Sequence, residues 1–212
     1  MDVMRNQAFH IFTGLLLLIP PLLVPETAAA SERVTTSLSG GITSSDTRTS
    51  FIDTQRLLGG SLKLMREAYS DGHYSVTYEA GFVSRGSRSE LGNDPLPYLH
   101  AGAMIRRYAA PEPLGSYFAW GWALDVLLKE PVNGWMVEEN MWDPDPKREH
   151  LSAFDIILAG EFGWVFSDRI SFGLRYEIGL IPINNKEGGG PFDLKGQPNN
   201  STLSLSLNYR IW

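Results

Sequence analysis

The stretch Ala153–Ile181 reads AFDIILAGEFGWVFSDRISFGLRYEIGLI and alternates apolar and polar residues on both sides of Ser167-Asp168-Arg169. Its large apolar residues stand at even positions: Phe154, Ile156, Leu158, Phe162, Trp164, Phe166, Ile170, Phe172, Leu174, Tyr176, Ile178 and Leu180. Outside the central triplet, its charged residues all stand at odd positions. Strand side chains alternate between two faces, whereas a helix repeats its apolar positions every three to four residues. The stretch therefore predicts a β-hairpin with one apolar and one polar face.

The same alternation recurs along the chain and predicts eight strands. We expect six more at 33–44, 57–69, 73–84, 98–109, 116–129 and 201–212. Short turns are expected at Ser70-Asp71-Gly72, 110–115 and 167–169, and these alternate with longer connections at 45–56, 85–97, 130–151 and 184–200. The alternation is weakest over 98–109, because His100, Met104, Arg106 and Tyr108 reduce the contrast between its faces, and we expect a β-bulge there.

Composition narrows the class of protein. The chain has 212 residues, 21 glycines and a formal net charge of -6, which suits one all-β domain. Basic residues form no stripe that could follow a phosphate backbone, so nucleic acid is not expected as a partner. Cysteine is absent, which excludes disulfides, thiolate metal sites and catalytic thiols. No residue set has the spacing of a metal or cofactor site.

Residues 1–30 resemble a signal peptide. Arg5 lies in a short polar start, an apolar run follows over 11–24, and Ala28-Ala29-Ala30 supplies the small residues that signal peptidase requires. The alternative is a retained membrane anchor, but the run is shorter than the 20 or so residues that a spanning helix needs. We therefore expect a cleaved signal peptide at 1–30 and one barrel domain at 31–212.

The alternation leaves open which face of the sheet points inward. A soluble barrel would enclose the apolar face, whereas a membrane barrel turns that face toward lipid. The apolar face carries more large side chains than the dozen or so that pack inside an eight-stranded barrel. The other face carries small residues between its charges: Gly59, Ser61, Gly81, Ala119, Gly121, Ala123, Ala159, Gly163, Gly173 and Gly179. This face fits inside, which predicts an all-β, eight-stranded antiparallel up-and-down transmembrane β-barrel.

With these features the chain resembles the small outer-membrane β-barrels of Gram-negative bacteria, of the OmpA transmembrane-domain, OmpX and OmpW kind. The resemblance rests on the export signal, the even number of strands, the alternating loop lengths and the final aromatic residue. It implies a monomer in the bacterial outer membrane that contacts lipid and lipopolysaccharide and has a structural or surface-interaction role. Trp212 departs from the family, because Ile211 holds the lipid-facing phase that the last aromatic residue normally holds.

Two other functions remain open from the sequence. One is a narrow channel for small solutes. The other is a lipid A-modifying enzyme, because His73-Tyr74-Ser75 resembles the His-x-Ser of lipid A deacylases. Val76 replaces the asparagine that follows the serine in that family, and the resemblance places His73 at the periplasmic end. We therefore expect no catalytic residues.

The long connection 130–151 is the candidate contact surface. Trp135, Met136, Met141 and Trp142 stand among acidic residues there. Such a loop could bind a surface partner, hold a divalent cation that bridges lipopolysaccharide phosphates, or fold back over the barrel mouth and bury its own tryptophans.

The two best-defined hairpins predict lumenal ion pairs. A three-residue loop at 70–72 would place Tyr69 opposite His73 and Lys63 opposite Glu79. In the same way, the turn at 167–169 would place Glu161 opposite Arg175. Both pairs fall on the inward face. We therefore expect Lys63, Glu79, Glu161 and Arg175 to cross-link and plug a lumen that is already narrow at eight strands.

Overall fold

The computed structural model describes residues 33–48, 55–70, 73–89, 92–110, 114–128, 154–181 and 199–212. These residues form eight strands: β1 (Val34–Arg48), β2 (Gln55–Tyr69), β3 (Tyr74–Ser89), β4 (Gly92–Tyr108), β5 (Gly115–Leu127), β6 (Phe154–Val165), β7 (Ile170–Gly179) and β8 (Asn199–Arg210). Within the described ranges, no helix is long and apolar enough to cross a membrane. The expected signal peptide at 1–30 and the contact loop at 130–151 lie outside the described residues.

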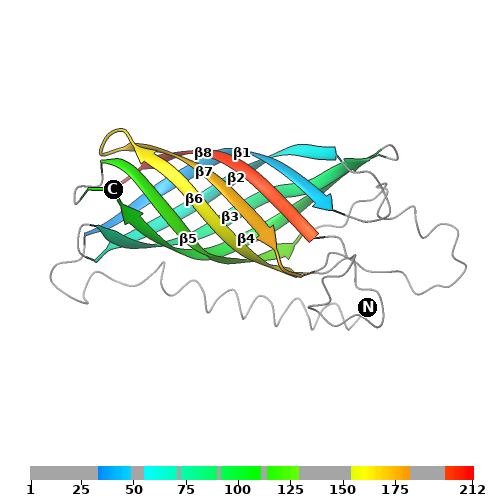
Figure 1. The fold of residues 1–212 in the computed structure, drawn as a ribbon, viewed down its shortest axis with the longest axis horizontal. Helices are drawn as coiled ribbons and strands as arrows, with labels where there is room; N and C mark the ends of the chain where they lie inside the picture. Colours follow the sequence, from blue (N-terminus) through cyan, green and yellow to red (C-terminus); the bar gives the residue numbers. More distant parts are fainter. Residues whose placement is uncertain are drawn as a thin grey trace, which may run out of the picture.

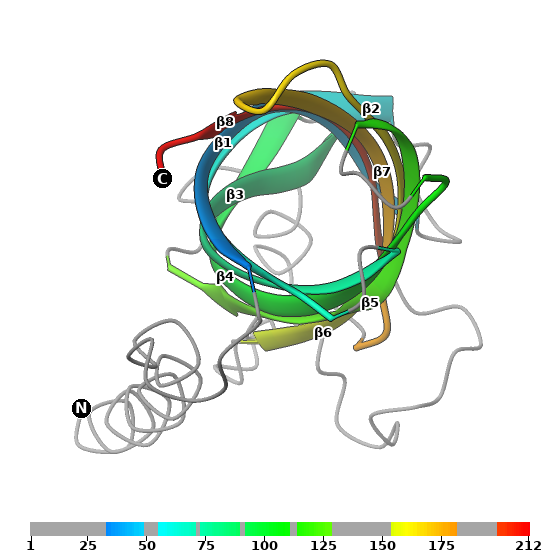
Figure 2. The same ribbon diagram turned by 90° about the vertical axis from the view of Figure 1, so that its left-hand side faces the viewer.

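The strands close into a single antiparallel barrel in chain order (Figures 1 and 2). The ring closes where β1 pairs with β8, over a ladder that runs from Ser37↔Arg210 to Arg48↔Asn199. The pairing continues past β8, because Ile211 N donates to Thr36 O and Thr36 N donates to Trp212 O, both at 2.8 Å. Each strand is therefore paired on both sides over most of its length, and the predicted fold class is confirmed.

The two faces of the strands are segregated as the alternation predicts. The apolar residues of the central hairpin point outward, and Phe162 exposes 50% of its surface. The same holds around the ring, because β1, β2, β5 and β8 also expose large apolar side chains. On β4, Leu99 and Ile105 face outward while His100 and Arg106 are buried, so this strand alternates like the others. A soluble barrel with an apolar interior is thereby excluded.

The expectation of a loop at 85–97 is wrong. β3 and β4 instead continue as a long hairpin whose ladder reaches Ser89↔Gly92. Pro95 and Pro97 suggested a loop, but β5 stops pairing at Tyr98↔Leu127, so this part of β4 is an edge. Edge strands tolerate proline, which lacks the N–H that a second neighbour would require.

The register of the β2–β3 hairpin is also corrected. Tyr69 pairs with Ser75 rather than His73, and Ser70 N donates to Tyr74 O at 2.9 Å, which moves the turn one residue along the chain. Lys63 therefore lies opposite Gly81, not Glu79. A shift of two positions keeps every side chain on its face. The register predicted for β6–β7 is confirmed, with Glu161 opposite Arg175.

The irregularity in the sheet lies between β2 and β3, not within β4. The register shifts between Arg56↔Ser87 and Ser61↔Val83, so β2 has one residue more than β3 there. The hydroxyl groups of β1 reach across β2 at this point. Thr43 Oγ1 donates to Ser84 O at 2.8 Å, and Ser45 Oγ donates to Gly86 O at 2.9 Å. These bonds satisfy β3 carbonyl groups where the ladder between β2 and β3 is broken.

Candidate functional site

The lumen is the most unusual feature of the molecule, because its wall carries many buried ionisable groups. Its described acids are Glu67, Glu79, Asp125, Asp155, Glu161 and Glu177, and its buried bases are Lys63, Arg85, His100, Arg106 and Arg175. Buried charges are costly unless they are paired and hydrogen-bonded. The position of each group relative to its partners therefore decides what the lumen can do.

Arg175 on β7 lies at the centre of this network. Its Nε lies 2.7 Å from Glu161 Oε2, and its Nη2 donates to Glu79 Oε2 at 2.9 Å. Its Nη1 contacts Glu177 at 3.5 Å. One guanidinium thus joins carboxylates from β3, β6 and β7, which a planar five-donor group can do without distortion.

Lys63 and Glu79 also meet, despite the corrected register. Lys63 Nζ lies 3.4 Å from Glu79 Oε2 because the two residues are diagonal neighbours on the inward face. The four residues singled out from the sequence thus lie in one cluster, linked through Glu79 and Arg175.

His100 on β4 extends the cluster toward the end of the barrel where β1 and β2 are connected. Its Nε2 lies 2.8 Å from Glu79 Oε1 and its Nδ1 lies 2.6 Å from Asp125 Oδ1, and the ring is fully buried. Both ring nitrogens therefore face carboxylate oxygens, and both can donate only when the imidazole carries its second proton. The sequence places His100 in the strand expected at 98–109, but the alternation does not report its two carboxylate partners.

Arg85 continues the network beyond His100. Its Nη2 lies 2.7 Å from Asp125 Oδ2 and 2.9 Å from Glu177 Oε2, and its Nη1 donates to Thr202 Oγ1 at 3.1 Å. Arg85 was missed because it lay in the expected loop. The signal that could have found it is the alternation of Val83, Arg85 and Ser87, which continues the inward phase of β3.

Toward the short-turn end, Arg106 and Glu67 continue the network from Glu161, the partner of Arg175. Arg106 Nη1 lies 3.1 Å from Glu67 Oε2, and Arg106 Nη2 lies 3.5 Å from Glu161 Oε1, so the chain of contacts is continuous. Tyr69 and Tyr108 both donate to Glu67. Tyr117 donates to Glu161 at 2.7 Å and lies under the Arg106 guanidinium, whose Cζ is 4.2 Å from the ring centroid.

These tyrosines and Gly163 narrow the lumen at this end. The rings of Tyr69, Tyr108 and Tyr117 lie side by side, with successive centroids 5.8 Å apart. Gly163 leaves the space that Tyr117 fills, because a Cβ there would lie 2.2 Å from Tyr117 Cζ.

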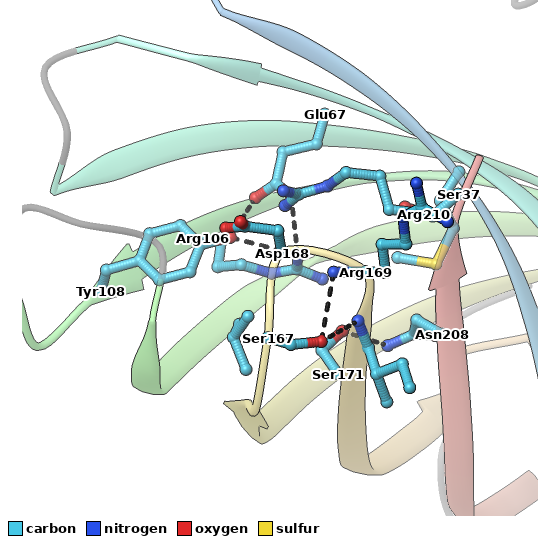
Figure 3. A pocket seen from close by; sticks show the side chains of 13 residues that line it. Ser37, Glu67, Arg106, Tyr108, Ser167, Asp168, Arg169, Ser171, Asn208 and Arg210 are labelled. Atoms are coloured by element: carbon cyan, nitrogen blue, oxygen red, sulfur yellow. Dashed lines mark hydrogen bonds and ion pairs between the residues drawn. The ribbon is translucent and has the colours of Figure 1, made fainter. Parts of the chain in front are cut away.

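A small pocket remains at the short-turn mouth, between Arg106, Arg210 and the turn at 167–169 (Figure 3). Its volume of about 20 Å³ suits roughly one water molecule. Arg210 Nη2 donates to Tyr69 OH at 3.1 Å, which links the mouth to the network.

The residues considered for catalysis do not form a nucleophile and base pair. Ser75 is buried in the lumen, where its Oγ donates to a carboxylate oxygen of Glu67. His73 lies exposed at the β2–β3 turn, and its backbone O accepts from Tyr108 N at 2.7 Å. The candidate contact residues Trp135, Met136, Met141 and Trp142 lie outside the described residues. Within the described part of the chain, no group of three potential metal ligands occurs.

The fold and its two surfaces define the class. A closed eight-stranded barrel with an apolar exterior and a charged interior is a transmembrane β-barrel. Soluble proteins do not expose an apolar belt of this extent.

Solved structures of similar architecture include Neisserial surface protein A, at 8% identity and a TM-score of 0.49, which covers 85% of this chain and 99% of that one. The attachment invasion locus protein Ail of Yersinia pestis, solved with the heparin analogue sucrose octasulfate, is 11% identical with a TM-score of 0.47. The match covers 84% of this chain and 99% of Ail. The outer membrane protein AlkL is 12% identical with a TM-score of 0.44, and the match covers 88% of this chain and 94% of AlkL. No family model and no curated sequence matches this chain. These identities are too low to transfer the role of any residue.

Proposed function

We propose that this protein is a sealed outer-membrane β-barrel with a structural or surface-interaction role, not a pore and not an enzyme. The lumenal network carries the proposal. It runs without a gap from Arg210 at the short-turn mouth to Arg85 near the opposite end. Each of its carboxylates has a cationic partner, whereas Asp155 beside it accepts hydrogen bonds from Ile181 N and Asn200 Nδ2. A solute would have to break several buried ion pairs to pass, which is costly in a low-dielectric interior.

The orientation follows from the lengths of the connections. Outer-membrane barrels turn their short turns to the periplasm and their longer loops to the cell surface. The ends of the barrel chain, near Arg33 and Trp212, lie at the short-turn end. The contact loop at 130–151 would then emerge on the outside, where it can meet a partner.

A non-enzymatic role is supported by the use of the lumenal groups. The lumenal carboxylates that could serve as bases are engaged in ion pairs and hydrogen bonds. Ser75 illustrates this, because its hydroxyl is committed to Glu67.

Conductance across planar bilayers tests the seal. We expect the purified barrel to show no stable open state, and we expect Arg175→Ala with Arg85→Ala to open one by removing two cations that cross-link the lumen. A steady conductance of the unaltered protein would favour the narrow channel instead. Mass analysis of lipid A from cells with and without the protein tests the enzymatic alternative, and we expect identical lipid A species.

A further inference from the structure

Arg210 on β8 differs from the other lumenal arginines, because no acidic side chain among the described residues pairs with it. Its side-chain hydrogen bond there runs from Nη2 to the neutral hydroxyl of Tyr69, at 3.1 Å. By contrast, Arg85, Arg106 and Arg175 each lie within 3.5 Å of two or more carboxylates. A charge that is partly removed from water is unfavourable without a counter-ion. The half-buried Arg210 therefore needs a negative charge from another source.

The neighbours of Arg210 across the sheet do not supply that charge. On one side Arg210 pairs with Ser37 of β1, whose side chain shares the inward face. On the other side Arg210 N donates to Arg169 O at 2.8 Å, so the next residue is a second arginine, exposed at the turn. A neutral residue and a cation thus flank Arg210, whereas Arg175 has Glu161 directly opposite.

The pocket at the short-turn mouth contains hydrogen-bond donors without acceptors (Figure 3). Its lining includes Arg106, Arg210, Ser37 and Asn208. Three enclosed guanidinium nitrogens, Nε of Arg106 and both Nε and Nη1 of Arg210, have no hydrogen-bond partner among the described residues. Arg106 is 4% exposed, so its Nε does not face bulk water. Buried N–H groups are costly when no acceptor meets them, which points to an acceptor inside the pocket.

The two acids that line the pocket leave these donors unsatisfied. Both oxygens of Glu67 already accept hydrogen bonds from hydroxyl groups, and Oε2 also accepts from Arg106 Nη1. Asp168 lies exposed at the tip of the turn, where water and salt screen its charge. The missing acceptor must therefore come from outside the chain.

The size of the pocket limits what that acceptor can be. Its volume of about 20 Å³ admits one particle of about the size of a water molecule. A water molecule accepts two hydrogen bonds and carries no charge, so it would leave Arg210 without a counter-ion. A chloride ion is little larger than water, accepts from every donor around it and carries the missing charge. Phosphate and sulfate are too large.

We infer that the pocket at the short-turn mouth is a binding site for a monatomic anion, chloride, held by Arg106 Nε and by Nε and Nη1 of Arg210. The bound ion gives Arg210 the counter-ion that its strand neighbours lack. It also extends the lumenal ion-pair network to the last arginine of the barrel. The inference goes beyond the proposed function and holds whether or not the barrel conducts.

Chlorine NMR on barrel refolded in a non-ionic detergent tests the site, because exchange with a protein site broadens the chloride signal. The probe is sodium chloride, with the ionic strength held constant by sodium gluconate. We expect broadening in excess of that from detergent alone. Bromide should remove this excess, whereas sulfate should not, because it does not fit the pocket. The urea midpoint should also rise when chloride replaces gluconate, since an ion that binds only the folded barrel stabilises it.

Ser37→Asp is the most informative variant. It places a carboxylate directly opposite Arg210, with the two Cβ atoms about 4.5 to 5.5 Å apart. The variant should lose the excess broadening and the chloride dependence of the urea midpoint, yet be at least as stable in gluconate as the unaltered barrel. Arg210→Gln should also lose chloride binding. Arg107→Gln is the matched control, because Arg107 is exposed near the same end of the barrel but does not line the pocket, and both readouts should stay unchanged.

Broadening that sulfate removes as well as bromide does, or that persists in Ser37→Asp or Arg210→Gln, would assign the ion to exposed arginines and overturn the inference. Broadening no greater than that of detergent alone would show that the pocket holds water only, and would overturn it too. The competition between bromide and sulfate uses the unaltered barrel, so it decides the question even if a variant fails to refold.

Discussion

Replacing Arg175 with alanine should destabilise the barrel more than any other single change to a lumenal base. Arg175 is 3% exposed, and its guanidinium contacts three carboxylates, those of Glu79, Glu161 and Glu177. Removing one partner of a buried ion pair typically costs about 3 to 5 kcal/mol, because the remaining charge is left in a medium that solvates it poorly. Three carboxylates share this loss, so we expect a value near the upper end of that range.

The assay is urea unfolding of barrels refolded into lipid vesicles, followed by tryptophan fluorescence and by the heat-dependent shift in gel mobility. Arg169→Ala is the matched control, because Arg169 is exposed at the β6–β7 turn and its side chain donates a long hydrogen bond, of 3.5 Å, to Tyr209 OH. Exposed substitutions of this kind usually change the free energy of unfolding by less than about 0.5 kcal/mol. Adding Glu161→Gln to Arg175→Ala should recover part of the loss, because it removes one orphaned charge. A loss for Arg175→Ala no larger than that of Arg169→Ala would show that water solvates the lumen, and would refute the reasoning.

Three further substitutions probe other parts of the barrel in the same assay. His100→Ala removes the link between Glu79 and Asp125 and should cost about 1 to 3 kcal/mol, because each carboxylate loses a hydrogen bond but keeps an arginine partner. Gly163→Ala would bring a Cβ within 2.5 Å of Phe172 O and should cost about 1 to 3 kcal/mol, whereas Gly160→Ala on the same strand, with no atom within 4 Å, should be tolerated. Thr43→Val leaves a backbone carbonyl of β3 without its donor and should cost about 1 kcal/mol; an unchanged urea midpoint would mean that water replaces the hydroxyl group.

The central hairpin shows how much of the barrel follows from sequence. Strict alternation fixes which side chains share a face, and the turn at 167–169 fixes the register, so the pairing of Glu161 with Arg175 could be predicted. The charges of neighbouring hairpins then had to meet in a closed ring. Strand count, barrel closure and the identity of most lumenal charges follow from this one pattern.

Other features depend on contacts that alternation does not report. Ser70-Asp71-Gly72 is compatible with more than one turn position, and the choice made in the fold moves Lys63 two places relative to Glu79. Pro95 and Pro97 are incompatible with a strand that is paired on both sides, so they predict a loop. They are tolerated within β4 because β5 stops pairing at Tyr98, which leaves this part of β4 with β3 as its one neighbour among the described strands. Because those prolines predicted a loop at 85–97, Arg85 was not recognised from the sequence as a lumenal residue.

The seam between β1 and β8 has a consequence for assembly. Hairpins such as β6–β7 join residues that are close in sequence, and these can form as soon as both strands are present. The seam instead joins Ser37 to Arg210, so it must wait until the last strand has been delivered. Until then β1 and β7 both present open edges, and non-local closure of this kind is slow and exposes the chain to aggregation. The final strand therefore acts as the closing step of folding, and delaying it should divert the chain into aggregates before it reaches the membrane.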